Sequence, residues 1–140
     1  MAYLFDTDAI SELWRPRPSP PYLEWVATVH REEQFISAVS VGELYKGAFK
    51  SPAKDKYLSI IEAHTLPLFT VLPYDTKVAR VYGEIRAMME IEGKVVADPD
   101  LQIGATALCF GLALVTGNIK HFQKIPGLML EPISRTGPTR

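Results

Sequence analysis

The chain lacks several features that would place it in a specialised class of protein. Only one cysteine, Cys109, is present among 140 residues, which excludes a disulfide framework and a thiolate metal cluster. No apolar run approaches the roughly 20 residues of a membrane span, and no charged-then-apolar leader stands at the N-terminus. We therefore expect a soluble, cytoplasmic protein that does not bind membranes, with Cys109 in its core.

An excess of charge of one sign is also missing. Fifteen Lys and Arg against sixteen Asp and Glu leave a net charge of −1, which argues against a protein that holds nucleic acid by bulk charge alone. Any such contact must be local or assisted by cations. The length and the 47% hydrophobic content suit one domain with a proper core. We expect a single domain over residues 1–133 and a flexible tail over residues 134–140.

Short apolar runs alternate with longer amphipathic segments. The runs are typical of buried strands and lie at residues 3–5, 35–39, 68–72, 112–115 and 128–130. The longer segments have apolar side chains three and four residues apart, which is typical of helices, and lie at residues 8–14, 20–31, 40–49, 53–66, 75–92 and 100–110. This alternation predicts an α/β sandwich of three layers, with a mostly parallel sheet of about five strands covered by helices on both faces.

Acidic residues recur where an expected strand ends or an expected helix begins. Asp6 directly follows the first apolar run, while Glu43 and Asp100 stand near the start of two expected helices. In parallel α/β sheets, ligands bind where strands end and helices begin. Carboxylate oxygens select hard cations such as Mg²⁺ or Mn²⁺. The pattern therefore predicts a metal site at one edge of the sheet.

Helix capping is the competing interpretation of these acids. Asp8 fits the N-cap of the first helix. Ser40 and Glu43 fit a capping box, in which each side chain bonds the other residue's backbone amide. Asp98 fits an N-cap with Pro99 at the first helical position.

Two further acids show the limits of that interpretation. Asp75 precedes an ordinary expected helix and has no acidic companion, so we interpret it as a cap. Asp6 stands where a buried strand leaves the sheet, and an unpaired buried carboxylate there needs a partner. Capping alone does not explain why Asp6, Glu43 and Asp100 recur at positions that this architecture can bring to one edge.

Four sequence blocks, in this order, resemble a known family. They are Leu4-Phe5-Asp6-Thr7-Asp8, the segment from Ser37 to Gly47 around Glu43, the segment from Asp100 to Ala107, and the segment from Leu114 to Phe122. Their order and the chain length resemble the PIN-domain ribonucleases, and more closely the VapC toxins of bacterial and archaeal toxin–antitoxin pairs. The resemblance covers nearly the whole chain and implies the PIN-like form of the three-layer sandwich.

The resemblance also implies an activity and a set of site residues. The activity is that of a metal-dependent endoribonuclease that uses Mg²⁺, with Mn²⁺ as a substitute. The metal ligands implied are Asp6, Glu43 and Asp100, with Asp98 as an accessory acid and with Thr116 and Asn118 as the usual polar positions. Many relatives carry a further acid in the last block, where this chain has Asn118 and His121. Asp8, commonly Asn in relatives, adds a charge.

The expected partners follow from the same resemblance. They are an RNA substrate and a VapB-type antitoxin, whose C-terminal Arg or Lys would enter the acidic groove and displace the metal. A homodimer and a heterotetramer or larger complex with the antitoxin are implied. A hydrophobic cleft and subunit contact are expected from the apolar residues Leu44, Tyr45, Tyr57, Ile60 and Ile61. Nothing in the sequence encodes a base preference, so transfer, ribosomal and messenger RNA all remain open as targets.

Two other classes of function compete with the nuclease. Asp6-Thr7-Asp8 after a strand also resembles the aspartyl-nucleophile motif of haloacid-dehalogenase-type phosphatases, although the continuation Ala9-Ile10 departs from that motif. A degenerate PIN-like domain that only binds a partner would use the acids as caps. Such a domain would show no carboxylate-dependent stabilisation by Mn²⁺.

Overall fold

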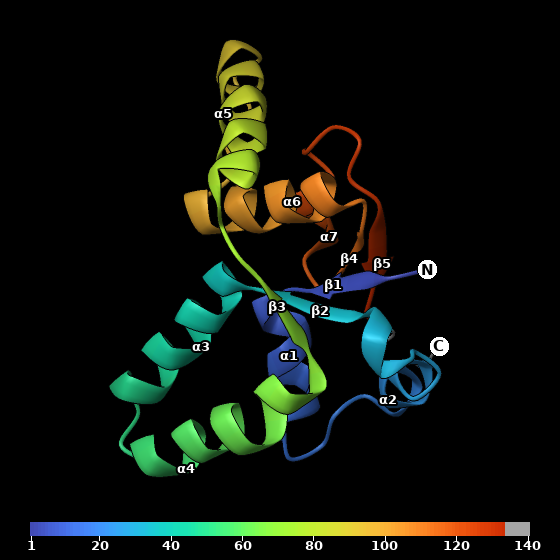
Figure 1. Cartoon of the computed structure of the whole chain (residues 1–140), viewed down its shortest axis with the longest axis vertical. Coiled ribbons are helices and arrows are strands. Elements are labelled where there is room, and N and C mark those ends of the chain that lie inside the picture. The colour runs from blue at the N-terminus through green and yellow to red at the C-terminus, as the bar shows by residue number, and fades with distance from the viewer. Residues whose placement is uncertain (134–140) are drawn as a thin grey trace.

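Five parallel strands form one sheet in residues 1–133, the part of the chain that the computed structural model describes (Figure 1). The strand order is β3-β2-β1-β4-β5, and every neighbouring pair runs parallel. The strands are β1 (Tyr3–Phe5), β2 (Gln34–Ser37), β3 (Thr70–Leu72), β4 (Ala113–Thr116) and β5 (Leu130–Pro132). The expected α/β fold is confirmed, with strand bounds that differ by one to three residues from those expected. The tail expected at residues 134–140 lies outside the described residues.

Helices fill most of the intervals between the strands. They are α1 (Thr7–Leu13), α2 (Pro20–Val26), α3 (Ala38–Lys50), α4 (Lys54–Ser59), α5 (Thr76–Ile91), α6 (Asp98–Phe110) and α7 (Ile119–Phe122), with one-turn 3₁₀ segments at Arg31–Glu33 and Leu66–Leu68. The helix expected over 20–31 ends earlier, and the one expected over 53–66 continues beyond α4 as a π-helix, Ile60–Thr65. The sequence did not predict α7, because four residues are too few to show a helical period.

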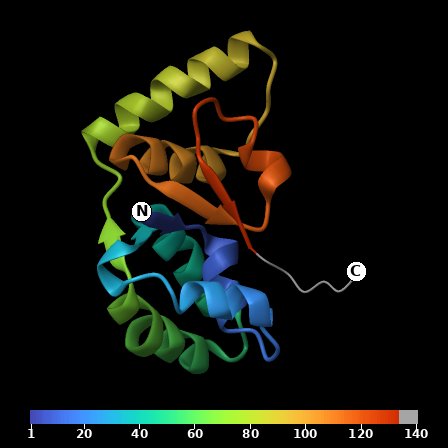
Figure 2. The same ribbon diagram turned by 90° about the vertical axis from the view of Figure 1, so that its right-hand side faces the viewer.

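The helices lie in two layers, one on each face of the sheet (Figures 1 and 2). Leu4 and Leu114 are paired across β1 and β4 and contact a buried apolar cluster beneath α5 and α6. Phe5 and Val115, the next residues along the same strands, contribute to the cluster beneath α1 and α2 on the opposite face. Because successive strand residues point to opposite faces, these continuous apolar runs bury both faces of a parallel sheet.

The start of α1 corrects one expected cap and the start of α5 confirms another. Asp6, rather than Asp8, is the N-cap of α1, and its carboxylate accepts a hydrogen bond of 2.7 Å from the amide of Ala9. Asp75 caps α5 as expected, since its carboxylate accepts a bond of 3.1 Å from the amide of Val78. An N-cap carboxylate satisfies an otherwise unpaired amide of the first turn.

The expected caps of two later helices are wrong by a short distance. Ser37 is the N-cap of α3 and accepts from the amide of Ser40 at 3.0 Å, so the expected capping box does not form. The helix begins earlier because β2 ends at Ser37 and passes directly into α3. Ala97 precedes α6, which places Asp98 inside the first turn rather than at the cap.

The end of α6 returns the chain to the sheet. Gly111 adopts a φ of 67°, the left-handed conformation that favours glycine at a helix C-terminus. β4 then begins at Ala113. Cys109 near this end is only partly buried, so its expected place in the core is only partly confirmed. No helix within residues 1–133 is long and apolar enough to cross a membrane.

Candidate active site

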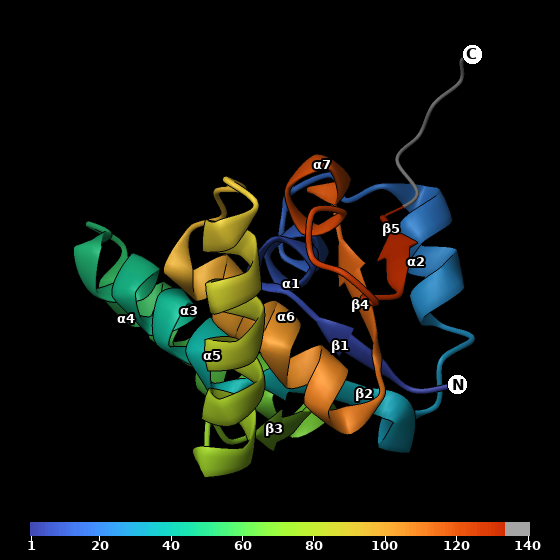
Figure 3. The same cartoon turned by 90° about the horizontal axis from the view of Figure 1, so that it is seen from above.

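The carboxyl ends of β1, β2 and β4 open into one acidic pocket. Asp6 follows β1, α3 follows β2, and Thr116 ends β4. Helices α1, α6 and α7 meet near this edge (Figure 3). The pocket, about 320 Å³ in volume, is lined by Asp6, Thr7, Asp8, Ser11, Glu43, Lys46, Asp100, Ile103, Asn118 and Phe122. The structure thus brings together all three expected metal ligands with Asn118, and adds Asp8.

Asp6 is the most deeply buried acid of this pocket. Its exposed fraction is 4%. Burial raises the pKa of Asp6 to about 7, and the nearby charges of Asp8 and Asp100 add to that effect. Hydrogen bonds from the Thr116 hydroxyl and from the Ala9 amide oppose it. A carboxyl group held in this way favours a cation that would compensate its negative charge.

Thr116 links Asp6 to the turn that carries Asn118. The Thr116 side chain is completely buried and hydrogen-bonds to the carboxyl group of Asp6. Its Oγ1 also accepts a bond of 2.9 Å from the amide of Asn118. The expected polar positions therefore differ in location: Thr116 supports Asp6 from beneath, whereas Asn118 lines the pocket itself.

Glu43 is held by a residue that the sequence did not identify as part of the site. Thr7 Oγ1 donates a hydrogen bond of 2.5 Å to Glu43 Oε1, across a separation of 36 residues. Thr7 follows Asp6 directly and opens α1, while Glu43 lies on α3. The only sequence signal for Thr7 is its place beside Asp6.

Asp100 is paired with His121, which extends from the unexpected helix α7. His121 Nδ1 lies 3.0 Å from Asp100 Oδ2, and both side chains are partly exposed. The site thus has a histidine beside a candidate metal ligand, in the block where many relatives of the resembled family carry a further acid. His121 contacts the site through Asp100.

Asp98, expected as an accessory acid, does not line the acidic pocket. It accepts hydrogen bonds of 2.5 Å from the Tyr82 hydroxyl and 2.6 Å from Arg86, both on α5. These two bonds hold the pKa of Asp98 below its usual value. Asp98 and Asp100 are two residues apart on one helix, so their side chains point about 200° apart around its axis.

The oxygen-rich pocket suits a hard cation. Within residues 1–133, however, no three His, Cys, Asp or Glu side chains are arranged as a ready ligand set. Thr7 engages Glu43 and His121 engages Asp100, so ligation by all three expected acids requires side-chain rotation. Asp6, Glu43 and Asp100 as metal ligands, and Mg²⁺ or Mn²⁺ as the cofactor, stay predictions.

A second, mainly apolar pocket of about 400 Å³ adjoins the acidic one. Thr7, Ser11 and Glu43 line both pockets. Its walls come from α1, α3, α4 and the π-helix, and its apolar lining comprises Ile10, Trp14, Pro16, Leu44, Ala48, Tyr57, Ile60 and Ile61. The expected hydrophobic cleft is therefore present without Tyr45, whose hydroxyl bonds Glu62 instead.

Comparison with known proteins assigns this architecture to a family. The PIN domain profile matches residues 3–128. Toxin FitB of Neisseria gonorrhoeae is 34% identical over 124 residues, which cover 85% of this chain and 89% of FitB. The tRNA(fMet)-specific endonuclease VapC of Salmonella typhimurium is 30% identical over 131 residues, covering 94% of this chain and 97% of that protein.

Solved structures agree with this assignment. A chain in the crystal structure of VapBC2 from Rickettsia felis, bound to a DNA fragment from their promoter, superposes with a TM-score of 0.86 and 28% identity. The match covers 96% of this chain and all of that chain. This protein therefore belongs to the PIN domain family, and the relatives named above are toxins or endonucleases of that family.

Proposed function

We propose that the protein is a divalent-cation-dependent endoribonuclease and the toxin of a toxin–antitoxin pair that acts in the cytoplasm. The observation that carries this proposal is the buried, proton-retaining Asp6 in one pocket with Asp8, Glu43 and Asp100. Four acids at one edge repel each other unless a cation neutralises them. The curated relatives named as ribonuclease toxins support the RNA substrate and the class of reaction.

Asp6, Glu43 and Asp100 would hold Mg²⁺ or Mn²⁺, directly or through water. Once bound, the cation would lower the pKa of an attacking water and balance charge on the phosphate oxygens. Because Asp6 also accepts bonds from Ala9 and Thr116, its carboxylate is already oriented. This orientation limits the rearrangement needed when RNA binds.

The remaining polar residues act through these acids or on the substrate. Thr7 positions Glu43, and Thr116 donates to Asp6, so both hydroxyls orient carboxylates. The Asn118 amide faces the pocket and can donate to a phosphate oxygen. Asp8 lines the same pocket and is suited to interact with a water near the metal.

The proposed antitoxin would use the two adjoining pockets together. A C-terminal segment of a small protein could place apolar side chains beside Leu44 and Ile60. An Arg of the same segment could reach the acidic pocket, because a guanidinium can satisfy two carboxylate oxygens at once. Such a segment would occupy the place of the cation and block cleavage.

Cleavage assays with acid-to-amide variants test the proposed activity. We expect Asp6→Asn, Glu43→Gln and Asp100→Asn each to lower Mg²⁺- or Mn²⁺-dependent RNA cleavage by more than about 100-fold, since loss of supporting contacts alone costs 10–100-fold. Circular dichroism should show folded variants. Asp75→Asn is the matched control, because Asn also caps helices well and Asp75 lies outside the pocket.

The substrate is identified by sequencing RNA ends after brief induction of the wild type beside Asp6→Asn. The name of the Salmonella relative makes tRNA(fMet) a first candidate. Cleavage that persists in chelator, or that survives Asp100→Asn at the wild-type rate, would contradict the proposed metal chemistry.

A further inference from the structure

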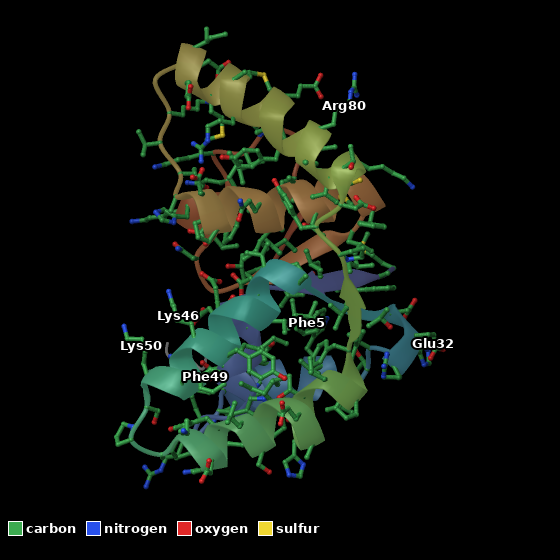
Figure 4. The ribbon with its side chains drawn as sticks, turned by 60° about the vertical axis from the view of Figure 1, so that its left-hand side comes forward. Phe5, Glu32, Lys46, Phe49, Lys50 and Arg80 are labelled. Atoms are coloured by element: carbon green, nitrogen blue, oxygen red, sulfur yellow. The ribbon has the colours of Figure 1, made fainter. Side chains whose placement is uncertain are left out.

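Two lysines of α3 project from the molecule beside the acidic pocket. Lys46 lines that pocket, and Lys50 follows one helical turn later. Figure 4 shows both side chains extending outward on the same side of α3. Within residues 1–133, neither ammonium group has an ion-pair or hydrogen-bond partner, whereas Glu43 one turn before Lys46 bonds Thr7. Both positive charges are therefore available to a ligand.

An exposed aromatic ring lies between these lysines in the sequence. Phe49 is 61% exposed, although it is a large apolar side chain. Its ring stacks on that of Tyr45, with centroids 6.3 Å apart and an interplanar angle of 25°. The Tyr45 hydroxyl in turn donates a bond of 2.9 Å to Glu62. The flank of α3 thus carries a supported aromatic surface next to two free cations.

The charge distribution favours RNA as the occupant. The chain has a net charge of −1 and its pocket has four acids, which repel phosphate until a cation is bound. Lys46 is the sole basic side chain among the described residues that line the pocket. Single-stranded nucleic acid is bound by cationic grooves combined with aromatic rings on which bases stack. An acidic pocket continuous with such a surface matches that combination.

We propose that Lys46, Phe49 and Lys50, here termed the α3 strip, bind the RNA strand as it leaves the acidic pocket. Lys46 and Lys50 contact two phosphates, since four residues of helix separate them by about 6 Å along the axis. Phe49 stacks on an unpaired base between them. This inference rests on the proposed ribonuclease function and specifies single-stranded RNA flanking the cleaved bond as the bound segment.

The lysines are tested by binding in a chain that cannot cleave. The probe is a fluorescein-labelled single-stranded RNA of about 12 nucleotides, a length within the site sizes of single-strand binders, added to Asp6→Asn. Adding Lys46→Gln and Lys50→Gln should weaken binding about tenfold and lower the slope of log K against log salt by about 1.4, or 0.7 for each phosphate contact.

Arg80→Gln in the same background is the matched control. Arg80 loses the same charge but projects from α5 away from the two lysines in Figure 4, and no ion pair or hydrogen bond involves it within residues 1–133. Affinity and salt slope should stay at the parental values. If Arg80→Gln weakens binding as much as one lysine substitution does, the effect is one of net charge and the α3 strip is overturned.

Phe49 is tested separately from charge. We expect Phe49→Ala to weaken binding fivefold or more with an unchanged salt slope, since stacking contributes about 1–3 kcal/mol per base. Phe49→Tyr should restore affinity because it keeps the ring. Equal affinities for the Ala and Tyr variants would overturn the stacking role.

Kinetics separate this inference from the proposed function. In the otherwise unchanged chain, Lys46→Gln with Lys50→Gln should raise KM for RNA with kcat largely retained, whereas the acid variants lose kcat. Wild-type cleavage with unaltered KM in the double variant would overturn the α3 strip and leave the nuclease intact. A double variant with unaltered RNA affinity but lost self-association or antitoxin binding would show that the α3 strip is a protein interface.

Discussion

At the scale of single residues, Asp6 combines two roles that the sequence presented as alternatives. Its carboxylate caps α1 through the amide of Ala9 and also faces the acidic pocket. The cap and the site therefore share one side chain. Its burial makes the charged form costly, because a buried carboxylate loses hydration that its hydrogen bonds only partly replace.

The raised pKa of Asp6 predicts an unusual dependence of stability on pH. In chelator, the folded state keeps a proton on Asp6 that the unfolded chain has released, so the free energy of unfolding should fall as the pH rises from about 4 to about 7. The wild type should lose up to about 4 kcal/mol relative to Asp6→Asn over this interval, from a pKa of 3.8 to about 7 at 1.36 kcal/mol per unit.

Urea denaturation of both proteins at several pH values measures this difference. Saturating Mn²⁺ should reduce it, because the cation stabilises the ionised acids of the folded state. A degenerate, non-catalytic domain would show no such effect of Mn²⁺. Parallel pH profiles for the two proteins in chelator would contradict the burial of Asp6.

Thr7 provides a second prediction at this scale. Thr7→Val removes the hydroxyl that holds Glu43 and keeps the shape of the side chain. We expect Mn²⁺ affinity, measured by calorimetry, to fall about tenfold, as is typical when a supporting contact of a ligand is lost. Thr7→Ser keeps the hydroxyl and should bind Mn²⁺ nearly as well as the wild type. Unchanged affinity in Thr7→Val would show that Glu43 needs no such support.

At the scale of secondary-structure elements, the start of α6 is attached to α5 by one polar cluster. Arg86 donates bonds to the carbonyl of Val96, at 2.9 Å, and to Asp98. Tyr82 donates to the same carboxylate. The cluster positions the first turn of α6, and with it Asp100, at the edge of the sheet.

This arrangement predicts different results for the two acids of that turn. Asp98→Asn should leave the metal-dependent cleavage rate close to that of the wild type, because its side chain is 65% exposed and contacts α5. Asp100→Asn should abolish cleavage, as stated above. A comparable loss in a folded Asp98→Asn variant would restore Asp98 to the accessory role that the family resemblance implied.

The packing of α6 rests on a glycine at its close approach to the segment after α7. A Cβ on Gly104 would lie 2.7 Å from Ile125 Cδ1, and Ile125 is buried. Gly104→Ala should therefore destabilise the fold by about 1 kcal/mol, since overpacking outweighs the gain in helix propensity.

A double-mutant cycle by urea denaturation measures this contact. Ile125→Val removes Cδ1 and should cost about 1 kcal/mol alone. The pair should be more stable than the sum of the single effects predicts, because Val leaves room for the new methyl group. Additive effects would place the cost of Gly104→Ala elsewhere.

At the scale of the whole molecule, the acidic and apolar pockets form one continuous surface. Their shared lining of Thr7, Ser11 and Glu43 lies between the sheet edge and the cleft under α4. A single extended partner segment can therefore fill both pockets. This arrangement links inhibition to binding, because the same segment would exclude the cation.

Coexpression with the small gene adjacent to this one tests the proposed antitoxin. The complex should purify intact and relieve growth arrest, while Ile60→Glu should abolish the complex and retain cleavage, because it places a charge in the apolar pocket. Ile91→Glu is the matched control, since Ile91 is 87% exposed at the end of α5. A complex that survives Ile60→Glu would place the antitoxin elsewhere.

Much of the fold could be predicted because its signals are local. Apolar runs such as residues 3–5 and 112–115 must be buried on both faces, which requires a parallel sheet between helices. Asp75 could be identified as a cap because a cap contacts only its own helix. The cap of α3 was misplaced from Ser37 to Ser40, because strand pairing decides where β2 stops.

The sequence by itself determined the strand and helix alternation, the acids behind the strands and the family pattern. Only the tertiary structure decided which polar groups meet: Thr7 with Glu43, His121 with Asp100, and Asp98 with Arg86. The physical reason is that these contacts join segments far apart in the chain. Local periodicity and capping carry no information about the direction in which a side chain such as Asp98 or Asp100 leaves a packed helix.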